Sequence, residues 1–429
     1  MISPSAIARG IGHRLFYGWV ILGVAFVGMF VTGPGQTFTV SVFVNPLIEE
    51  LGLSRTSLAG VYAWGTGVAA LGFYFVGRLI DRLGPRWMIA TIALCLGLAC
   101  LLFPLVSGLI SLFFAFTAIR FFGQGALTLG CNNLVAHWFS RRRGMALSVA
   151  TVGFALGSAV YPPAVQWLIL QVGWRASWMV LGILVWGLMI PLAVTLVVNK
   201  PEELGLLPDG DGGTTPTRAA ASSEPPPEEA FTVSEALGTA TFWILALALS
   251  IPSMLITGLI FHQISYFQEQ GLDAQSAANI FTVTAVSMVF FMVVFGQLLD
   301  RFRTQTVVAG GILTLAATMW VMRIADTPLL AGLYGVGLGA TLGAMMTTIG
   351  FVWPRYFGRT HLSGIQGTAF TISIIGASLG PIPFALAFDF LGGYHDAVLG
   401  LSLLPLFFGV LVFFTPPARK PGGSPTTSG

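Results

Sequence analysis

Charged side chains are scarce in this sequence. Aspartate, glutamate, lysine and arginine make up 9% of the 429 residues, against about 25% in an average soluble domain. Apolar residues make up 55%, and they gather in runs of about 20 residues, which is long enough to cross a bilayer as a helix. The composition therefore excludes an ordinary soluble protein and predicts a polytopic membrane protein. The net charge of +3 gives no sign of a nucleic-acid partner.

Cysteine and catalytic motifs are scarce as well. Cys95, Cys100 and Cys131 all fall inside apolar runs, so we expect small buried residues and not a disulfide set or a metal site. The sequence contains no P-loop, no metal-ligand spacing and no nucleophile–base pattern. It therefore predicts neither an enzyme nor a bound cofactor.

The apolar runs predict twelve membrane-spanning helices. The first is interrupted by Gly33-Pro34-Gly35-Gln36, because proline removes a backbone donor and glycine loosens the turn. Inside a membrane such a break is tolerated only against protein or a water-filled cavity, so Gln36 is a candidate substrate-binding residue. Gly153 and Gly157, four residues apart, predict a close helix crossing. The predicted spans are 17–44, 57–80, 87–106, 109–137, 145–170, 174–198, 242–268, 274–299, 304–324, 329–356, 362–391 and 397–415.

These spans predict an all-α membrane protein with two similar six-helix bundles, at residues 1–198 and 242–416. The segment 199–241 is rich in proline, glycine, serine and acidic residues, so we expect a flexible linker, with a short interfacial helix near its end. Residues 417–429 are expected to form a disordered tail.

The basic residues predict the orientation in the membrane. With twelve spans, only Arg55, Arg175 and Arg323 of the extramembrane basic residues fall on one side, and the others fall on the opposite side. Positive charge marks the cytoplasmic side. We therefore expect both termini and the linker in the cytoplasm, and a multi-pass protein of the bacterial inner membrane.

A short charged loop separates the second and third predicted spans. It reads Gly77-Arg78-Leu79-Ile80-Asp81-Arg82-Leu83-Gly84-Pro85-Arg86, and a weaker copy containing Gly296, Asp300 and Arg301 follows 219 residues later. The pattern G-x-x-x-D-R-x-G-x-R between two spans resembles the loop between helices 2 and 3 of the major facilitator superfamily. The resemblance implies a conformational latch formed by Gly77, Asp81, Arg82, Arg86, Asp300 and Arg301. The alternative is a solvated loop whose charges cap helix ends.

Arg120 is the one basic residue predicted to lie inside a span. The stretch from Arg120 to Gly125, which includes Gln124, resembles the helix 4 motif of the same superfamily. Its guanidinium can bind an anionic substrate as a bidentate fork, or it can bond backbone carbonyls of helix 1 and brace the bundle. The internal repeat pairs Arg120 with Tyr334 of helix 10, so Tyr334 and Gln124 are further candidates for substrate binding.

Two other titratable residues are candidates for proton coupling. His262 lies within the seventh span, where it can bind substrate or carry a proton, or stay neutral and bond a neighbouring carbonyl. Asp389 lies late in the eleventh span, where a helix-end or interhelical bond is the alternative role.

Several short motifs narrow the resemblance. They are Tyr17-Gly18-Trp19, residues 201–210, Tyr356-Phe357-Gly358 and residues 389–394, and together they look like bacterial members of the monocarboxylate porter and oxalate:formate antiporter branch. That branch commonly carries an arginine in helix 8, with an aspartate one turn before it in animal members. Here those positions are Phe291 and Ser287.

We therefore predict a monomeric secondary transporter that moves a small organic anion across the lipid bilayer by alternating access, with proton symport. The aromatic-rich, charge-poor second half leaves an exporter of amphiphilic compounds as one alternative. The other alternative is a membrane sensor that binds solute without transporting it.

Overall fold

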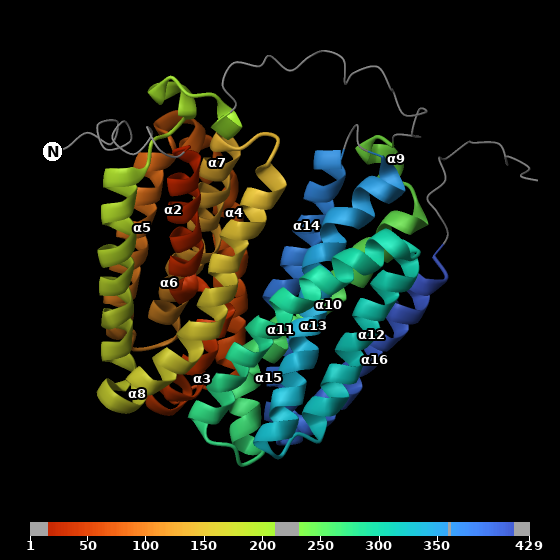
Figure 1. Ribbon diagram of the computed structural model, residues 1–429. Helices are drawn as coiled ribbons and strands as arrows, with labels where there is room; N and C mark the ends of the chain where they lie inside the picture. The colour runs from red at the N-terminus through yellow and green to blue at the C-terminus, as the bar shows by residue number, and fades with distance from the viewer. Residues whose placement is uncertain (1–15, 211–230, 359–361, 416–429) are drawn as a thin grey trace, which may run out of the picture. The chain divides into compact units, whose positions relative to one another are not determined.

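The computed structural model describes residues 16–210, 231–358 and 362–415, and the side chains of Tyr74, Asp81, Leu362 and Ser363 lie outside that description. Every regular element in these ranges is helical, which confirms the predicted all-α class (Figure 1). The first half contains α2 (Gly18–Val31), η1 (Gly33–Gly35), α3 (Thr37–Leu51), α4 (Arg55–Leu83), α5 (Pro85–Leu102), η2 (Phe103–Leu105), α6 (Leu109–Ile119), η3 (Arg120–Leu127), α7 (Thr128–Trp138) and α8 (Arg143–Leu196).

The second half repeats this series of long helices from α10 to α16. Two short 3-10 segments, η4 and η5, and a small helix, α9, lie between the two series. These elements are η4 (Pro201–Leu204), η5 (Pro208–Gly210), α9 (Val233–Leu237), α10 (Ala240–Glu269), α11 (Ala274–Arg301), α12 (Thr304–Arg323), α13 (Pro328–Phe357), α14 (Leu362–Leu379), α15 (Pro381–Leu391) and α16 (His395–Phe413).

The helices form two compact units. The first contains the helices from α2 to α8, together with residues 260–265 of α10 and 273–285 at the start of α11. Within it α8 packs along both α2 and α5, and α4 packs against α6. The second unit contains α9, the remainder of α10 and α11, and α12 to α16. Within it α12 packs along α13 and α16 (Figure 1).

Eleven helices in the described ranges are long and apolar enough to cross a membrane. One of them, α8, has 54 residues, which at 1.5 Å per residue would reach about 80 Å and far exceed a hydrocarbon core of about 30 Å. Its continuity is interrupted at Gly173, where φ is 80° and ψ is 164°. Only glycine adopts such a conformation readily, so α8 comprises the predicted fifth and sixth spans, and the twelve crossings agree with the sequence.

The interruptions and close approaches follow from glycine and proline. The predicted break in the first span is present, because a 3-10 turn at Gly33–Gly35 separates α2 from α3. The predicted close crossing is also present, since a Cβ on Gly153 would lie 2.1 Å from the carbonyl oxygen of Phe26. One interruption was not expected: the eleventh span divides into α14 and α15 at Gly380. A Cβ there would lie 2.2 Å from the carbonyl oxygen of Met254.

The segment predicted to be a flexible linker, 199–241, has regular structure at both ends. η4 and η5 follow α8, and the amide of Phe231 donates to the carbonyl oxygen of Phe357 at 3.1 Å. Thr232 and Glu235 cap α9 reciprocally, which is the predicted short helix. These ends form because each finds hydrogen-bond partners and apolar neighbours that composition alone does not reveal. The predicted tail at 417–429 lies outside the described residues.

The outer surface of the helices is apolar. Leu71, Phe75, Ile110 and Phe390 all expose more than 60% of their area. Such exposure would be a liability in water, but it suits helices that are surrounded by lipid.

Candidate functional site

Arg120 lies in an irregular part of the fourth span. Residues Arg120–Leu127 form a π-helical segment between two α-helices, and such segments are frequent at functional sites. The side chain is 2% exposed. Nη1 donates to the carbonyl oxygen of Gly35 at 2.9 Å and to Oγ1 of Thr37 at 3.3 Å, while Nε donates to Oγ1 of Thr66 at 3.1 Å.

An aromatic ring completes the surroundings of Arg120. Its guanidinium carbon lies 5.0 Å from the centre of the Tyr62 ring, a distance at which the ring attracts a cation. The Tyr62 hydroxyl and Oγ1 of Thr37 are 2.8 Å apart. Tyr62 and Thr66 lie on α4, so the arginine ties the break in the first span to the second span.

Glycine permits this arrangement. A Cβ on Gly35 would lie 2.3 Å from the carbonyl oxygen of Ile119 and 2.7 Å from the Cα of Gly123. The backbones of the first and fourth spans therefore touch beside Arg120. The carbonyl of Gly35 can accept from the arginine because it belongs to a short 3-10 turn and not to a continuous α-helix.

The charge on Arg120 has no acidic partner among the described side chains. Its contacts are neutral oxygens and an aromatic face. Among the described residues, none accepts a hydrogen bond from Nη2. A buried cation held only by neutral groups is costly inside a membrane span. The bond from Nη1 to the carbonyl oxygen of Gly35 is the kind of contact that the bracing alternative predicts, and it leaves substrate binding by the same side chain open.

Two glutamines lie near Arg120. Gln36 follows the 3-10 turn, is 6% exposed and donates from Nε2 to Oγ1 of Thr32 at 3.3 Å. Gln124 is partly exposed, and its backbone nitrogen would lie 2.8 Å from a Cβ on Gly35. The structure therefore brings Gln36, Arg120 and Gln124 together around the break.

The other candidates lie on later helices. His262 is 2% exposed on α10, in the part of that helix that belongs to the first unit, and its ring lies 4.9 Å from that of Phe261. Tyr334 is fully buried on α13 of the second unit, 5.3 Å from the ring of Phe267. Asp389 is exposed at the end of α15. Both His262 and Asp389 have interaction partners within the structure.

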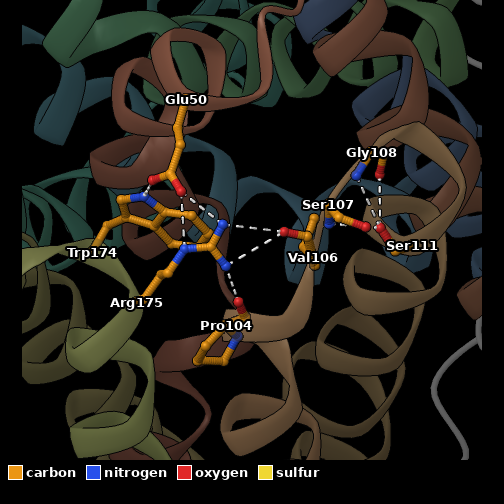
Figure 2. Close-up of polar contacts among 8 residues, drawn as sticks. All are labelled: Glu50, Pro104, Val106, Ser107, Gly108, Ser111, Trp174 and Arg175. Atoms are coloured by element: carbon orange, nitrogen blue, oxygen red, sulfur yellow. Dashed lines mark hydrogen bonds and ion pairs between the residues drawn. The ribbon is translucent and has the colours of Figure 1, made fainter.

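A cluster at one end of the first unit was missed by the sequence analysis (Figure 2). The carboxylate of Glu50, at the end of α3, accepts from Nε and Nη2 of Arg175 at 3.0 and 2.7 Å, and from the indole nitrogen of Trp174. Arg175 also donates to the carbonyl oxygens of Pro104 and Val106. The cluster joins the first span, the Gly173 turn and the loop before the fourth span. Glu50 and Arg175 are both charged and close to helix ends, but only the fold shows that they pair.

At the opposite end of the first unit, Arg86 contacts the end of α8. Its Nη2 donates to the carbonyl oxygen of Val194 at 2.7 Å, and its backbone amide donates to Oδ1 of Asn199 at 2.9 Å. A Cβ on Gly84 would lie 2.8 Å from the same oxygen, and Gly84 has a φ of 81°. Glycine is therefore required in this turn by both space and conformation.

Comparison with known proteins identifies the family. The profile of the Major Facilitator Superfamily matches residues 25–381. The chain belongs to the Major Facilitator Superfamily. It is therefore a membrane transporter by family and not an enzyme, as the sequence predicts.

Several superfamily members are similar to this chain. The oxalate:formate antiporter of Oxalobacter formigenes is 24% identical over 96% of this chain and 94% of its own. Monocarboxylate transporter 13 of Bos taurus is 24% identical over 94% and 92%. The glycerol-3-phosphate transporter of Bacillus subtilis is 27% identical, but the match spans only 43% of each chain. A crystal structure of a bacterial homologue of the lysosomal transporter Spinster covers 94% of this chain and 97% of its own, with a TM-score of 0.71 at 15% identity. That likeness concerns the fold.

The superfamily loop motif occupies the turn between α4 and α5. Gly77 has open space around it, because a Cβ there would meet no atom within 4 Å. Arg82, Asp300 and Arg301 are exposed, and no hydrogen bond or ion pair joins their side chains to a described residue. Asp81 has helical backbone, but its side chain lies outside the description. Of the six predicted latch residues, the structure therefore gives a defined partner only to Arg86.

The structure places no charge at the positions of helix 8 where the branch carries an arginine and an aspartate. Ser287 is 8% exposed and donates to the carbonyl oxygen of Val336 at 2.9 Å. Phe291 packs against the buried cluster formed by Phe295, Leu299, Val307 and Ala344. In α11 one of these positions therefore makes a hydrogen bond to a neighbouring helix and the other a packing contact.

Proposed function

We propose that this superfamily member moves a small organic acid across the bacterial inner membrane by alternating access, with proton symport. The relatives named for oxalate, formate and monocarboxylates match almost the whole chain. The distribution of arginines favours cytoplasmic termini. In this proposal the two bundles are residues 1–198 and 242–416, and the protein works as a monomer.

Arg120 carries the proposal. It is a buried cation beside a broken helix, it has no acidic partner among the described side chains, and Nη2 donates to none of them. A substrate carboxylate can pair with Nη2 without breaking an existing bond. A bidentate fork requires Thr66 or Thr37 to release Nε or Nη1, so we infer a single strong charge-assisted bond as the first contact. We propose that Gln36 and Gln124, which lie beside the same break, add neutral hydrogen bonds.

Proton coupling is assigned to His262, with Asp389 as the second candidate. His262 is buried within the apolar stretch of α10, where a change of protonation has a large energetic effect. Tyr334 is proposed as the neutral counterpart of Arg120 in the second bundle. Because Ser287 and Phe291 carry no charge, we propose that the first bundle binds the anion.

The test is uptake by the purified protein in liposomes. Formate, lactate and oxalate, each radiolabelled, are offered with an inward proton gradient, with the gradient collapsed, and with an inside-negative potential alone. We expect uptake of at least one acid that is stimulated by the proton gradient. Equal uptake rates with the proton gradient and with the gradient collapsed would exclude proton symport. No uptake of any acid, with gradient-driven efflux of an amphiphilic dye, would favour the exporter, and binding without any flux would favour the sensor.

A further inference from the structure

The carboxylate of Asp209 caps a turn that is far from it in sequence. Oδ2 accepts from the backbone amides of Ser140 and Arg141 at 3.0 and 2.7 Å, and Oδ1 accepts from that of Arg142 at 3.1 Å. These amides lie just before α8, whose own N-cap residue, Arg142, makes no side-chain cap. Asp209 therefore binds, from beyond the sixth span, the backbone amides of the turn that leads into the fifth span.

The backbone of Asp209 supports a specific role for this contact. Its φ is 65° and its ψ is −1°, and it is the one non-glycine residue in the described ranges with a positive φ. A left-handed conformation is costly for an ordinary side chain. The side chain is nevertheless 9% exposed. Burial alone would raise the pKa of this carboxyl, but the three amide donors and the charge of Arg141 hold the pKa below its ordinary value, so the cap stays ionised at neutral pH.

The turn around Asp209 is seated on aromatic rings. A Cβ on Gly210 would lie 2.7 Å from the ring of Phe16. That ring lies 6.0 Å from the ring of Trp138 and 5.8 Å from that of Phe139. Trp138 and Phe139 directly precede the capped turn. The carboxylate and the ring contacts thus hold the same two segments together.

The last residues of α8 and the chain that follows them accept hydrogen bonds from other spans of the bundle. Tyr17 donates its hydroxyl to the carbonyl oxygen of Leu196 at 2.7 Å, and the indole of Trp138 donates to that of Val198 at 3.0 Å. Arg86 contacts Val194 and Asn199, as described above. The first, third and fourth spans are therefore all hydrogen-bonded to the end of the sixth span or to the chain that follows it. Asp209 bonds the same chain to the turn before the fifth span.

We propose that Asp209 is a positioning residue for the transport cycle. Its contact makes the chain from Val194 to Gly210 part of the first bundle and fixes the start of the fifth span. The tether, meaning the part of the predicted linker 199–241 that is not bonded to the first bundle, then begins after Gly210 and not at Asn199. The first bundle then changes orientation as one rigid body, with a shorter tether than the sequence suggests. This inference rests on membership of the superfamily and not on the identity of the substrate.

The first arm of the test is amide hydrogen exchange on the full chain in nanodiscs. Asp209→Gly removes the carboxylate and suits the left-handed backbone, so the amides of Ser140, Arg141 and Arg142 should exchange at least about tenfold faster. Asp209→Asn retains one accepting oxygen and tolerates the same backbone, and should lie between. Asp273→Asn is the matched control, because Asp273 caps α11 by accepting from Ser276 at 2.9 Å and asparagine caps equally well.

The second arm is transport in liposomes, using the acid that is taken up fastest in the panel above. Asp209→Gly should lower turnover by at least about threefold with KM unchanged, because conformational steps commonly limit turnover. Asp209→Asn should recover part of it. If the amides of the Asp209 variants exchange at the parental rate, Asp209 does not hold the turn before the fifth span. If they exchange faster but turnover stays at the parental value, Asp209 is not a positioning residue for transport. If the glycine variant does not fold, the asparagine variant decides both arms. If the parent protein transports none of the acids, the result counts against the proposed function. The exchange measurement then decides by itself whether Asp209 holds the turn before the fifth span.

Discussion

The two halves of this transporter repeat one contact with different chemistry. In the first half, Arg86 of the loop after the second span donates to the carbonyl oxygen of Val194 at the end of the sixth. In the second half, Gln305, which is 219 residues later, donates to the carbonyl oxygen of Thr415 after the last span. The duplication has kept the position of the contact and exchanged a cation for an amide.

The same difference occurs inside the membrane. The fourth span carries Arg120, whereas the corresponding position of the tenth carries Tyr334, which is buried near Phe267. The close helix crossings are kept in both halves, at Gly153 against Phe26 and at Gly380 against Met254. Packing has therefore been retained by both bundles, while the buried positive charge belongs to the first. We infer that recognition of an anion has been concentrated in one half of a duplicated fold.

The largest expected effect follows from this asymmetry within the membrane. Arg120→Gln removes the charge and should reduce uptake to background, since an unpaired desolvated anion costs about 2–5 kcal/mol. Tyr334→Phe removes only a neutral hydroxyl and should keep uptake within about tenfold of the parent, because one neutral hydrogen bond contributes about 0.5–1.5 kcal/mol. Initial uptake rates in liposomes measure both. Equal losses of uptake rate in the two variants would show that both halves of the protein contribute to anion binding.

The second comparison concerns the two copies of the loop motif. If the loop is a latch made in one state only, Asp81→Asn should insert and fold but turn over about tenfold more slowly, because a state-specific contact shifts an equilibrium. Asp300→Asn should have a smaller effect, since its copy has Arg303 and Gln305 where the first has Gly84 and Arg86. Turnover at saturating substrate measures both. Parental rates in both variants would reject the latch.

The smallest expected effect concerns stability. Arg86→Met removes a bond from a charged donor, which contributes about 1.5–3 kcal/mol, whereas Gln305→Met removes a neutral one that contributes about 0.5–1.5 kcal/mol. Thermal unfolding in detergent should therefore rank parent, Gln305→Met and Arg86→Met in falling order. The reverse order would mean that the amide contact contributes more to stability than the charged one.

The sequence predicted most of the fold because long apolar runs and local backbone chemistry determine it. The break at Gly33–Gly35 follows from glycine and proline alone, and Gly173 falls between two predicted spans. The π-helical segment at Arg120 was not predictable from local sequence, and it lies where Gly123 contacts Gly35 of another span. The split at Gly380 likewise lies where α10 approaches.

The site was predictable in part. Arg120 stands out as a basic residue in an apolar run, and the sequence left its two roles open because its partners lie on other helices. Asp209 belongs to one of the short motifs, but its structural role was not predictable, since its left-handed backbone and its three amide donors exist only after folding. Glu50 and Arg175 are 125 residues apart, and nothing local to either residue indicates that they pair.

The most direct test of the account compares two arginines of the same bundle. Arg120→Gln and Arg175→Gln each remove a guanidinium that bonds several neighbours, and Arg175 lies in the Glu50 cluster and not beside the broken helix. Affinity for the transported acid and melting temperature are measured on the same purified variants. We expect both variants to melt at lower temperature, and only Arg120→Gln to lose affinity. Unchanged affinity with a lowered melting temperature in Arg120→Gln would show that this arginine only braces the first span, and would contradict the proposal that it binds the anion.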